Sequence, residues 1–234
     1  MKIKIFLALF LISQSCATTT NSLVEYRPPL LATVESVPPT AIIPVAKHKV
    51  VHIRFSSVVT RNSMNSLINQ IESANRAGAE AIVLEINSPG GDVAAGIDGS
   101  RAIEMSKAPV VCVVDGDASS MGSYILQSCD VRMMTKRSII MIHEPAFSGG
   151  VGGQPKDIEN ALNDLVALNK ALTEQYAKKM NISAEDIRAR IANGVSWYLN
   201  WDEAKYFKAV DQVVYSVEAV LDSYRSDLKA PAAL

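Results

Sequence analysis

The stretch from Gly116 to Ser123 contains the residues best placed for chemistry. It follows the apolar run Val110–Val114 and leads into Tyr124–Leu126, which is typical of the first turn of a buried helix. A strand, a turn of small residues and a helix present a serine at a helix N-terminus, where unpaired N–H groups and the helix dipole stabilise negative charge. This order predicts a serine nucleophile beside an oxyanion site. A tight turn that only needs small residues is the alternative.

Two further segments stand at the ends of expected strands. Asn87–Asp92 follows the apolar run Ala81–Ile86, and its two adjacent glycines permit positive φ and leave an N–H uncovered by a Cβ. In a parallel sheet both glycine-containing loops lie at the same edge, which is where such sheets bind ligands. His143 follows the expected strand Ser138–Ile142 and precedes a proline. Its backbone is fixed and its imidazole free, although a surface or core histidine is the simpler interpretation of this residue alone.

The elements that must position these residues alternate between strand and helix. Strand, helix and strand in close succession predict right-handed parallel crossovers, and therefore an α/β fold. A long amphipathic helix beyond this core indicates a subunit contact, or packing on its own domain. We expect strands at 50–55, 81–86, 110–114, 131–134, 138–142 and 210–214, an extended piece at 197–200, and helices at 64–77, 93–103, 155–180, 184–192, 203–208 and 217–228.

Composition excludes several classes of function. Hydrophobic residues make up 48% of the chain, charged residues 20%, and the net charge is −1. These values are ordinary for a globular protein and do not indicate nucleic-acid binding or a polybasic membrane surface. The chain has no P-loop pattern, and we expect neither a cofactor nor a metal.

The N-terminus has the pattern of a secretory signal peptide over residues 1–16. Basic, apolar and small residues follow one another up to Cys16, which stands where bacterial lipoproteins are lipidated. Cleavage by ordinary signal peptidase near Cys16 is the alternative. We expect an exported protein, either periplasmic or anchored as a lipoprotein; a cytoplasmic protein is the alternative. Residues 17–49 form a proline-rich arm or linker, residues 50–228 one domain, and residues 229–234 a frayed tail.

Two cysteines remain in the expected domain, Cys112 and Cys129, and both stand in apolar runs. Export would permit a disulfide, but two cysteines do not make a disulfide framework. We therefore expect two buried free thiols.

Four ordered motifs resemble the proteolytic subunit of the Clp protease, a member of the crotonase-like superfamily. They are Ile86–Gly91, Ala118–Ser123, Met141–Pro145, and Leu199–Ala204 followed by Val210–Asp211. The resemblance covers about residues 50–214. It implies the family's spiral of strand–strand–helix repeats with a protruding long handle helix. It also implies a serine endopeptidase that hydrolyses peptide or protein substrates.

The resemblance assigns a role to each matching residue. Ser120 is the nucleophile, and His143 is its general base and later the acid for the leaving amine. The backbone N–H groups of Gly91 and Met121 form the oxyanion hole. This agrees with the residues themselves, because a hydroxyl needs a base at neutral pH and a tetrahedral oxyanion needs fixed donors.

The third member of the triad departs from the family pattern. Ser196 stands in the place of the family's aspartate, with Asn193 just upstream. Either could orient the catalytic histidine by a hydrogen bond, but neither stabilises an imidazolium as a carboxylate does. We expect a slower enzyme, or one that works with serine and histidine alone. Glu144 and Asp202 are carboxylates that could substitute.

The resemblance also implies a homo-oligomeric ring, in which the long helix interleaves between rings. The family receives substrates from an ATP-driven unfoldase in the cytoplasm. An exported copy would lack ATP, so neither this partner nor processive degradation of large proteins follows for it.

Other functions remain open. A signal-peptide-peptidase-like hydrolase would pair Ser120 with Lys107 or Lys136 and leave His143 without a role. A catalytically silent scaffold would keep the core without the acid. An acyl-CoA crotonase is disfavoured, because that activity would give Ser120 and His143 no shared chemical role.

Overall fold

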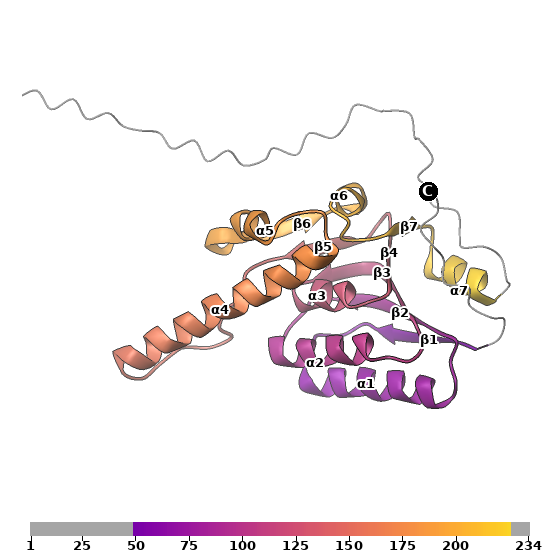
Figure 1. Cartoon of the computed structure of the whole chain (residues 1–234), viewed down its shortest axis with the longest axis horizontal. Coiled ribbons are helices and arrows are strands. Elements are labelled where there is room, and N and C mark those ends of the chain that lie inside the picture. Colours follow the sequence, from indigo (N-terminus) through magenta and orange to yellow (C-terminus); the bar gives the residue numbers. More distant parts are fainter. Residues whose placement is uncertain (1–48, 226–234) are drawn as a thin grey trace, which may run out of the picture. The chain divides into compact units, whose positions relative to one another are not determined.

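The computed structural model describes residues 49–225, whose elements appear in Figure 1. The predicted signal peptide at 1–16, nearly all of the arm at 17–49 and the tail at 229–234 lie outside the described residues. Strands and helices alternate through much of the described chain, so the predicted α/β fold is confirmed.

Five parallel strands form the centre of the sheet. Their order is β1-β2-β3-β4-β7, and every neighbouring pair is parallel. The strands are β1 (Val50–Phe55), β2 (Ala81–Ser88), β3 (Val110–Ser119), β4 (Val131–Thr135) and β7 (Gln212–Val214). Parallel pairing puts the carboxyl ends of these strands at one edge, where the two glycine-containing loops were expected.

Helices cover both faces of this sheet, because both sets of alternating side chains are apolar. Along β2, Ile82 and Leu84 belong to one buried cluster, and Val83 belongs to a second cluster on the opposite face. The first cluster packs against α1 (Arg61–Arg76), α2 (Val93–Glu104) and α3 (Met121–Gln127), and the second packs against α7 (Val217–Arg225). Figure 1 shows α1 and α2 side by side, with α7 apart from them.

β3 is longer than the sequence predicts. Its first part pairs with β4, and its last residues, Asp117–Ser119, pair in parallel with β5 (Ile139–Ile142). β5 in turn pairs antiparallel with β6 (Trp197–Leu199). The prediction of one continuous turn from Gly116 to Ser123 is therefore wrong, because a second partner strand holds most of that segment extended.

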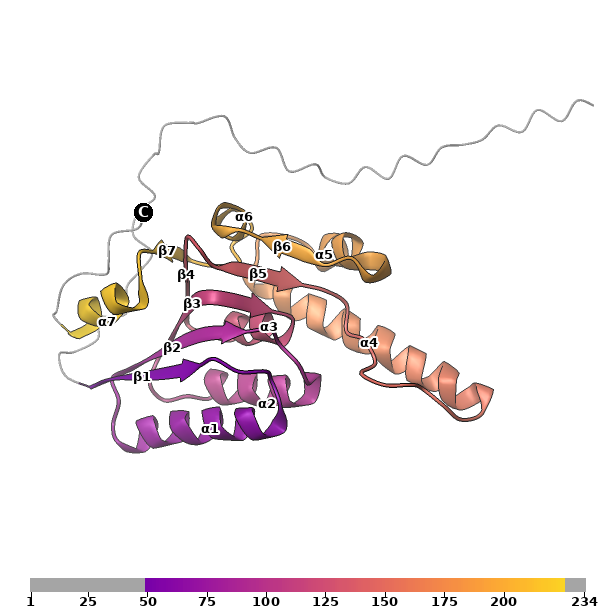
Figure 2. The ribbon, with the colours of Figure 1, turned by 180° about the vertical axis from the view of Figure 1, so that it is seen from behind.

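A long helix, α4 (Pro155–Lys179), reaches beyond the sheet, as Figure 2 shows. Its C-terminal part buries Leu172, Thr173 and Tyr176 against the rest of the domain. Its N-terminal part instead leaves an apolar stripe exposed, formed by Ile158, Leu162 and Val166. Because these three residues are four positions apart, they lie on one face of the helix.

Two short helices follow α4, and each begins at a capping side chain. Ser183 accepts from an N–H group at the start of α5 (Ala184–Ile191), and Asn200 does so at the start of α6 (Trp201–Tyr206). The cap at Asn200 starts α6 two residues before the helix expected at Glu203. Of the helices in residues 49–225, none is both long enough and apolar enough to span a membrane.

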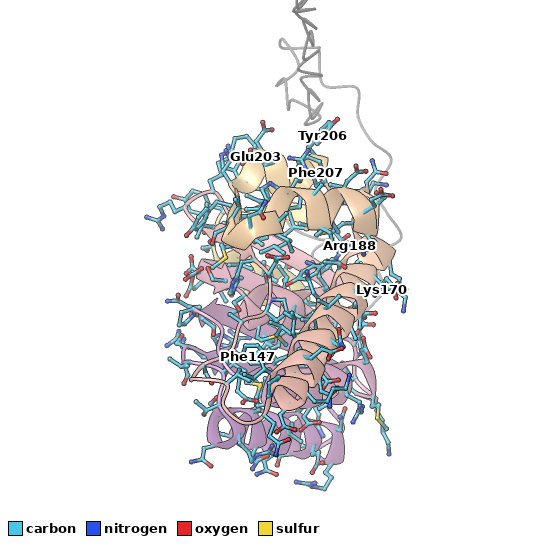
Figure 3. The ribbon with its side chains drawn as sticks, turned by 90° about the vertical axis from the view of Figure 1, so that its left-hand side faces the viewer. Phe147, Lys170, Arg188, Glu203, Tyr206 and Phe207 are labelled. Atoms are coloured by element: carbon cyan, nitrogen blue, oxygen red, sulfur yellow. A yellow bond between two sulfur atoms is a disulfide. The ribbon has the colours of Figure 1, made fainter. Side chains whose placement is uncertain are left out.

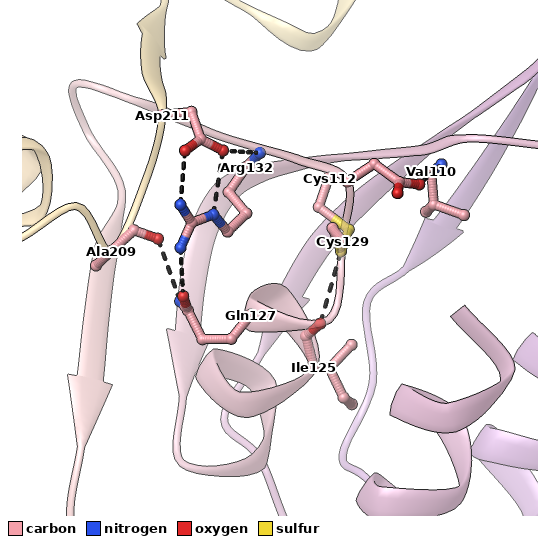
Figure 4. The surroundings of a disulfide bond; sticks show 9 residues. Val110, Cys112, Ile125, Gln127, Cys129, Arg132, Ala209 and Asp211 are labelled. Carbon is pink, nitrogen blue, oxygen red and sulfur yellow. Dashed lines mark hydrogen bonds and ion pairs between the residues drawn. A yellow bond between two sulfur atoms is a disulfide. The ribbon is translucent and has the colours of Figure 1, made fainter. Parts of the chain in front are cut away.

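A disulfide joins Cys112 of β3 to Cys129, which follows α3 (Figure 4). The prediction of two free thiols is therefore wrong. The two residues are 17 positions apart in sequence, but α3 folds back along β3 and brings their Cα atoms to 5.9 Å. That separation is in the usual range for a disulfide, and both residues are buried.

Beside the disulfide, a buried guanidinium joins four elements, and Figure 4 shows its contacts with Asp211 and Gln127. Arg132 of β4 donates to both carboxylate oxygens of Asp211, at 2.6 and 3.1 Å. It also donates to Oε1 of Gln127 at 2.7 Å and to the carbonyl oxygen of Lys179 at 3.2 Å. This network ties the C-terminal end of α4 to α3, β4 and the segment before β7.

Candidate active site

Ser120 stands at a sharp turn between the end of β3 and the start of α3. Its φ of 52° and ψ of −122° are unusual for a residue with a Cβ. Such a conformation costs about 1–3 kcal/mol and persists only when neighbours hold it. Here the Ser120 N–H donates to the carbonyl of Met141 at 2.8 Å, and the Ser120 carbonyl accepts from the N–H and the hydroxyl of Ser123. The turn places the Ser120 hydroxyl beside the ring of His143.

The structure brings Ser120 and His143 together. His143 Nε2 lies 2.8 Å from Ser120 Oγ, within hydrogen-bonding distance. The sheet explains the approach, because Ser119 at the end of β3 pairs with Met141 in β5, and His143 directly follows β5. A base at this distance can take the proton from the hydroxyl.

The glycine loop after β2 packs against the turn at Ser120. A Cβ on Gly90 would lie 2.6 Å from both the Ser119 oxygen and the Ser120 Cβ, so only glycine fits at this position. The loop is held by a ladder with Val59, whose N–H donates to the Gly90 oxygen at 2.7 Å. Gly91 follows at a φ of 147°, which favours glycine.

The two expected oxyanion donors have free N–H groups on the described part of the chain. Met121 is the first residue of α3, so its N–H has no acceptor within the helix. In the ladder with Val59, the neighbours of Gly91 make the hydrogen bonds, and the Gly91 N–H makes none to another described backbone group. Both groups remain available to an incoming oxygen.

The structure places Ser196 beside His143 without joining them. Ile142 pairs with Trp197 in the antiparallel ladder, so the next residues, His143 and Ser196, stand opposite each other. Among residues 49–225, the only hydrogen bond of the His143 ring is the one to Ser120. Asn193 is exposed in the turn before β6, at a φ of 60°, and makes no bond to the ring either.

The other carboxylates considered as substitutes have different partners. Glu144 accepts from the Asn169 amide at 3.0 Å and from the Gly194 N–H at 3.4 Å. Asp202 is exposed in the first turn of α6. Neither hydrogen-bonds to the His143 ring.

The two lysines considered for a serine–lysine dyad lie elsewhere. Lys107 precedes β3, at the opposite end of that strand from Ser120, and is exposed. The Lys136 ammonium lies 5.0 Å from the centroid of the Trp201 ring, a cation–π contact.

A small cavity of about 20 Å³ adjoins Ser120 and His143. Apolar side chains from α3, β5 and α4 line much of it, together with Tyr124, Asn169 and Tyr176. Burial raises the pKa of both tyrosines, so both remain neutral at ordinary pH. The Tyr176 hydroxyl lies 2.7 Å from the Ser123 hydroxyl, which joins α4 to the turn at Ser120.

Sequence reasoning missed Asn169 as a residue of this site. The signal was a polar residue inside the apolar stripe of the long helix, between Leu165 and Leu172. Helical spacing puts these three residues on one face, which predicts that the amide of Asn169 is turned toward the domain.

Two other observations bear on where the site lies. A larger hollow of about 790 Å³ runs along β1 and α1, but its asparagine, glutamine and serine side chains include no serine bonded to a histidine. Within residues 49–225, no three side chains of His, Cys, Asp or Glu gather into a group that could hold a metal ion.

Comparison with known proteins agrees with this geometry. The sequence model of the Clp protease family matches residues 45–217. The chain belongs to the Clp protease family. All four motifs found in the sequence lie inside the matched residues, so the resemblance to the Clp proteolytic subunit is confirmed.

The curated relatives of the Clp protease family are moderately similar to this chain. The ATP-dependent Clp protease proteolytic subunit 1 of Chlamydia abortus is 34% identical over 168 residues, which cover 69% of this chain and 85% of that protein. The subunit of the same name from Chlamydia caviae is 33% identical, over 70% and 86% of the two chains. That from Chlamydia pneumoniae is 32% identical, over 69% and 85%.

Proposed function

We propose that this chain is an exported serine endopeptidase of the Clp type. The observation that carries the proposal is the 2.8 Å contact between Ser120 Oγ and His143 Nε2. A serine hydroxyl becomes a nucleophile when an adjacent base removes its proton. The family membership supports peptide bonds as the substrate.

The reaction follows from this pair and the two N–H groups. Ser120 Oγ attacks the scissile carbonyl carbon while its proton passes to His143 Nε2. The tetrahedral oxyanion accepts hydrogen bonds from the N–H groups of Gly91 and Met121. His143 then returns the proton to the leaving amine, and an acyl-enzyme remains on Ser120. A water molecule, deprotonated by His143, hydrolyses this ester and restores the free hydroxyl.

The absence of an aspartate at position 196 lowers the expected rate. No described carboxylate hydrogen-bonds to His143, so the imidazolium formed during attack has no bonded anionic partner. In a serine protease, replacing the triad aspartate lowers kcat by up to about 10⁴-fold. We therefore expect turnover well below that of enzymes with a complete triad.

Export is supported by two independent features. The first is the signal-peptide pattern over residues 1–16. The second is the disulfide between Cys112 and Cys129, because disulfides form and persist in oxidising compartments outside the cytosol. We propose that the protein resides in the periplasm or on a membrane as a lipoprotein.

Assembly into a homo-oligomeric ring is supported by α4. Its exposed stripe of Ile158, Leu162 and Val166 is apolar, and their exposed fractions are 46%, 55% and 62%. An isolated helix face of this kind gains free energy when a second copy covers it. We propose that copies of this chain pair through α4. We do not propose an ATP-driven unfoldase as a partner, because an exported protein would lack ATP.

Labelling with a fluorophosphonate, which reacts with activated serines, tests the proposed function. We expect wild type to be labelled, Ser120→Ala to be unlabelled, and the neighbouring Ser119→Ala to be labelled as a control. His143→Ala should lose both labelling and peptide hydrolysis. Retained activity in His143→Ala would favour a lysine base instead. A folded wild-type chain without any labelling would make the protein a silent scaffold.

A further inference from the structure

We propose that Asn169 on α4 is the positioning residue that orients His143, and that Glu144 holds Asn169 in place. This inference rests on the proposed function and names the group that takes the place of the missing aspartate. It assigns that role to α4 rather than to Ser196 or Asn193.

The His143 ring needs an acceptor on its second nitrogen. For Nε2 to accept the Ser120 proton, the neutral ring must have its own proton on Nδ1. If the Nδ1–H group has no acceptor, the ring is not restricted to this tautomer. It is also not held in the orientation in which Nε2 faces Ser120. Among residues 49–225, this nitrogen makes no hydrogen bond, since the ring's one bond is that of Nε2 to Ser120.

Asn169 carries the complementary group, a side-chain oxygen that accepts no hydrogen bond within the described chain. Its Nδ2 donates to Glu144 Oε1 at 3.0 Å, and because a carboxylate only accepts, this contact fixes which end of the amide faces Glu144. The carbonyl Oδ1 therefore faces away from Glu144. It is buried and has no hydrogen-bond partner in the described chain. Buried hydrogen-bond acceptors are nearly always paired, so we expect Oδ1 to accept a hydrogen bond from a nearby donor.

The two residues that carry these groups line the same cavity. His143 and Asn169 line the cavity of about 20 Å³ beside Ser120. A cavity of this size accommodates one water molecule, which needs about 10–15 Å³. We assign the link to one bridging water, which accepts from His143 Nδ1–H and donates to Asn169 Oδ1. Water-mediated contacts of this kind are nearly as favourable as direct ones.

The surrounding contacts hold Asn169 at this position. Glu144 is fixed on its other side by the N–H of Gly194 at 3.4 Å. One turn further along α4, the Thr173 hydroxyl accepts from Arg188 of α5 at 3.0 Å; Figure 3 shows Arg188 beside α4. The amide is thus held by the residue that follows His143 and by a helix that is anchored to α5.

The sequence-based candidates lack these features. Ser196 stands opposite His143 in the ladder, but it does not line the cavity and does not bond to the ring. Asn193 is exposed to solvent. The other titratable groups on the cavity are Tyr124 and Tyr176, which burial keeps neutral, and Glu144 reaches His143 only through Asn169.

Kinetics of four variants test the proposal. We expect Asn169→Ala to lower kcat about tenfold or more at unchanged KM, the loss that one hydrogen bond implies. Asn163→Ala, which removes an exposed asparagine from the same helix, should stay within about twofold of wild type, and so should Ser196→Ala. The double variant Asn169→Asp/Glu144→Gln keeps one donor and one acceptor between these two side chains, places a carboxylate on the imidazolium side and should move the acidic limb of the kcat/KM profile to higher pH by about one unit.

Histidine NMR gives a readout that does not require hydrolysis. The chain has three histidines, so nitrogen-15 labelling of histidine and comparison with His143→Gln identifies the His143 signals. We expect the neutral ring to be protonated at Nδ1 in wild type and to become a mixture of tautomers in Asn169→Ala.

The outcomes separate the two proposals. An unchanged tautomer and an unchanged kcat in Asn169→Ala would overturn the role of Asn169, as would a tenfold loss in Ser196→Ala alone. A fixed Nδ1–H tautomer that depends on Asn169, in a chain without serine labelling, would support the positioning role and overturn the peptidase instead.

Discussion

The disulfide between Cys112 and Cys129 should contribute a measurable share of the stability. In the chain-entropy model, a cross-link lowers the conformational entropy of the unfolded chain. This loss grows with the logarithm of the number of residues in the closed loop. The two cysteines are 17 positions apart, and a loop of that length corresponds to about 3 kcal/mol at 25 °C. In a domain of this size, that difference lowers Tm by about 6–12 °C.

The assay is urea unfolding of a Cys16→Ser chain, in which only these two cysteines remain. Reduction should lower its free energy of unfolding by about 3 kcal/mol. The double variant Cys112→Ala/Cys129→Ala should be weakened to a similar degree and should not respond to reductant. This variant is the matched control, because any further effect of reductant on it must arise from elsewhere.

The same experiment can refute the reasoning. If thiol titration of the denatured, unreduced chain finds two free thiols, the disulfide is absent and the argument for export loses its structural support. If the bond is present but its reduction leaves the urea midpoint unchanged, the entropic estimate is wrong for this loop.

Three further predictions concern the elements around the site. Arg132→Ala leaves the Asp211 carboxylate without its cationic partner, so we expect the free energy of unfolding to fall by about 3 kcal/mol in urea titrations. Gly90→Ala pushes a Cβ onto Ser120, and serine labelling should be lost while circular dichroism still shows a folded chain. Burial raises the pKa of Tyr176 above 10, so unfolding releases its proton above pH 10 and stability falls there as pH rises; Tyr176→Phe should flatten that alkaline fall by up to about 1.4 kcal/mol per pH unit.

Local patterns located the elements well where one stretch of chain suffices. The apolar runs at β1, β2 and β3, the cap at Ser183 and the long helix at α4 all follow from spacing and side-chain type. The errors arose where a distant segment decides the outcome. The end of β3 is extended because β5 pairs with it, and Cys112 meets Cys129 because α3 folds back along β3.

The α/β class and the family follow from the residues alone, and the same residues predict Ser120 and His143 as the reacting pair. Their motifs are local, because a turn of small residues and the end of a strand are each specified by a few consecutive residues. The bond between Cys112 and Cys129 and the cavity that Asn169 shares with His143 are instead products of tertiary packing. Those contacts depend on how a helix folds back along a strand and how α4 packs, and no short stretch of sequence specifies either distance.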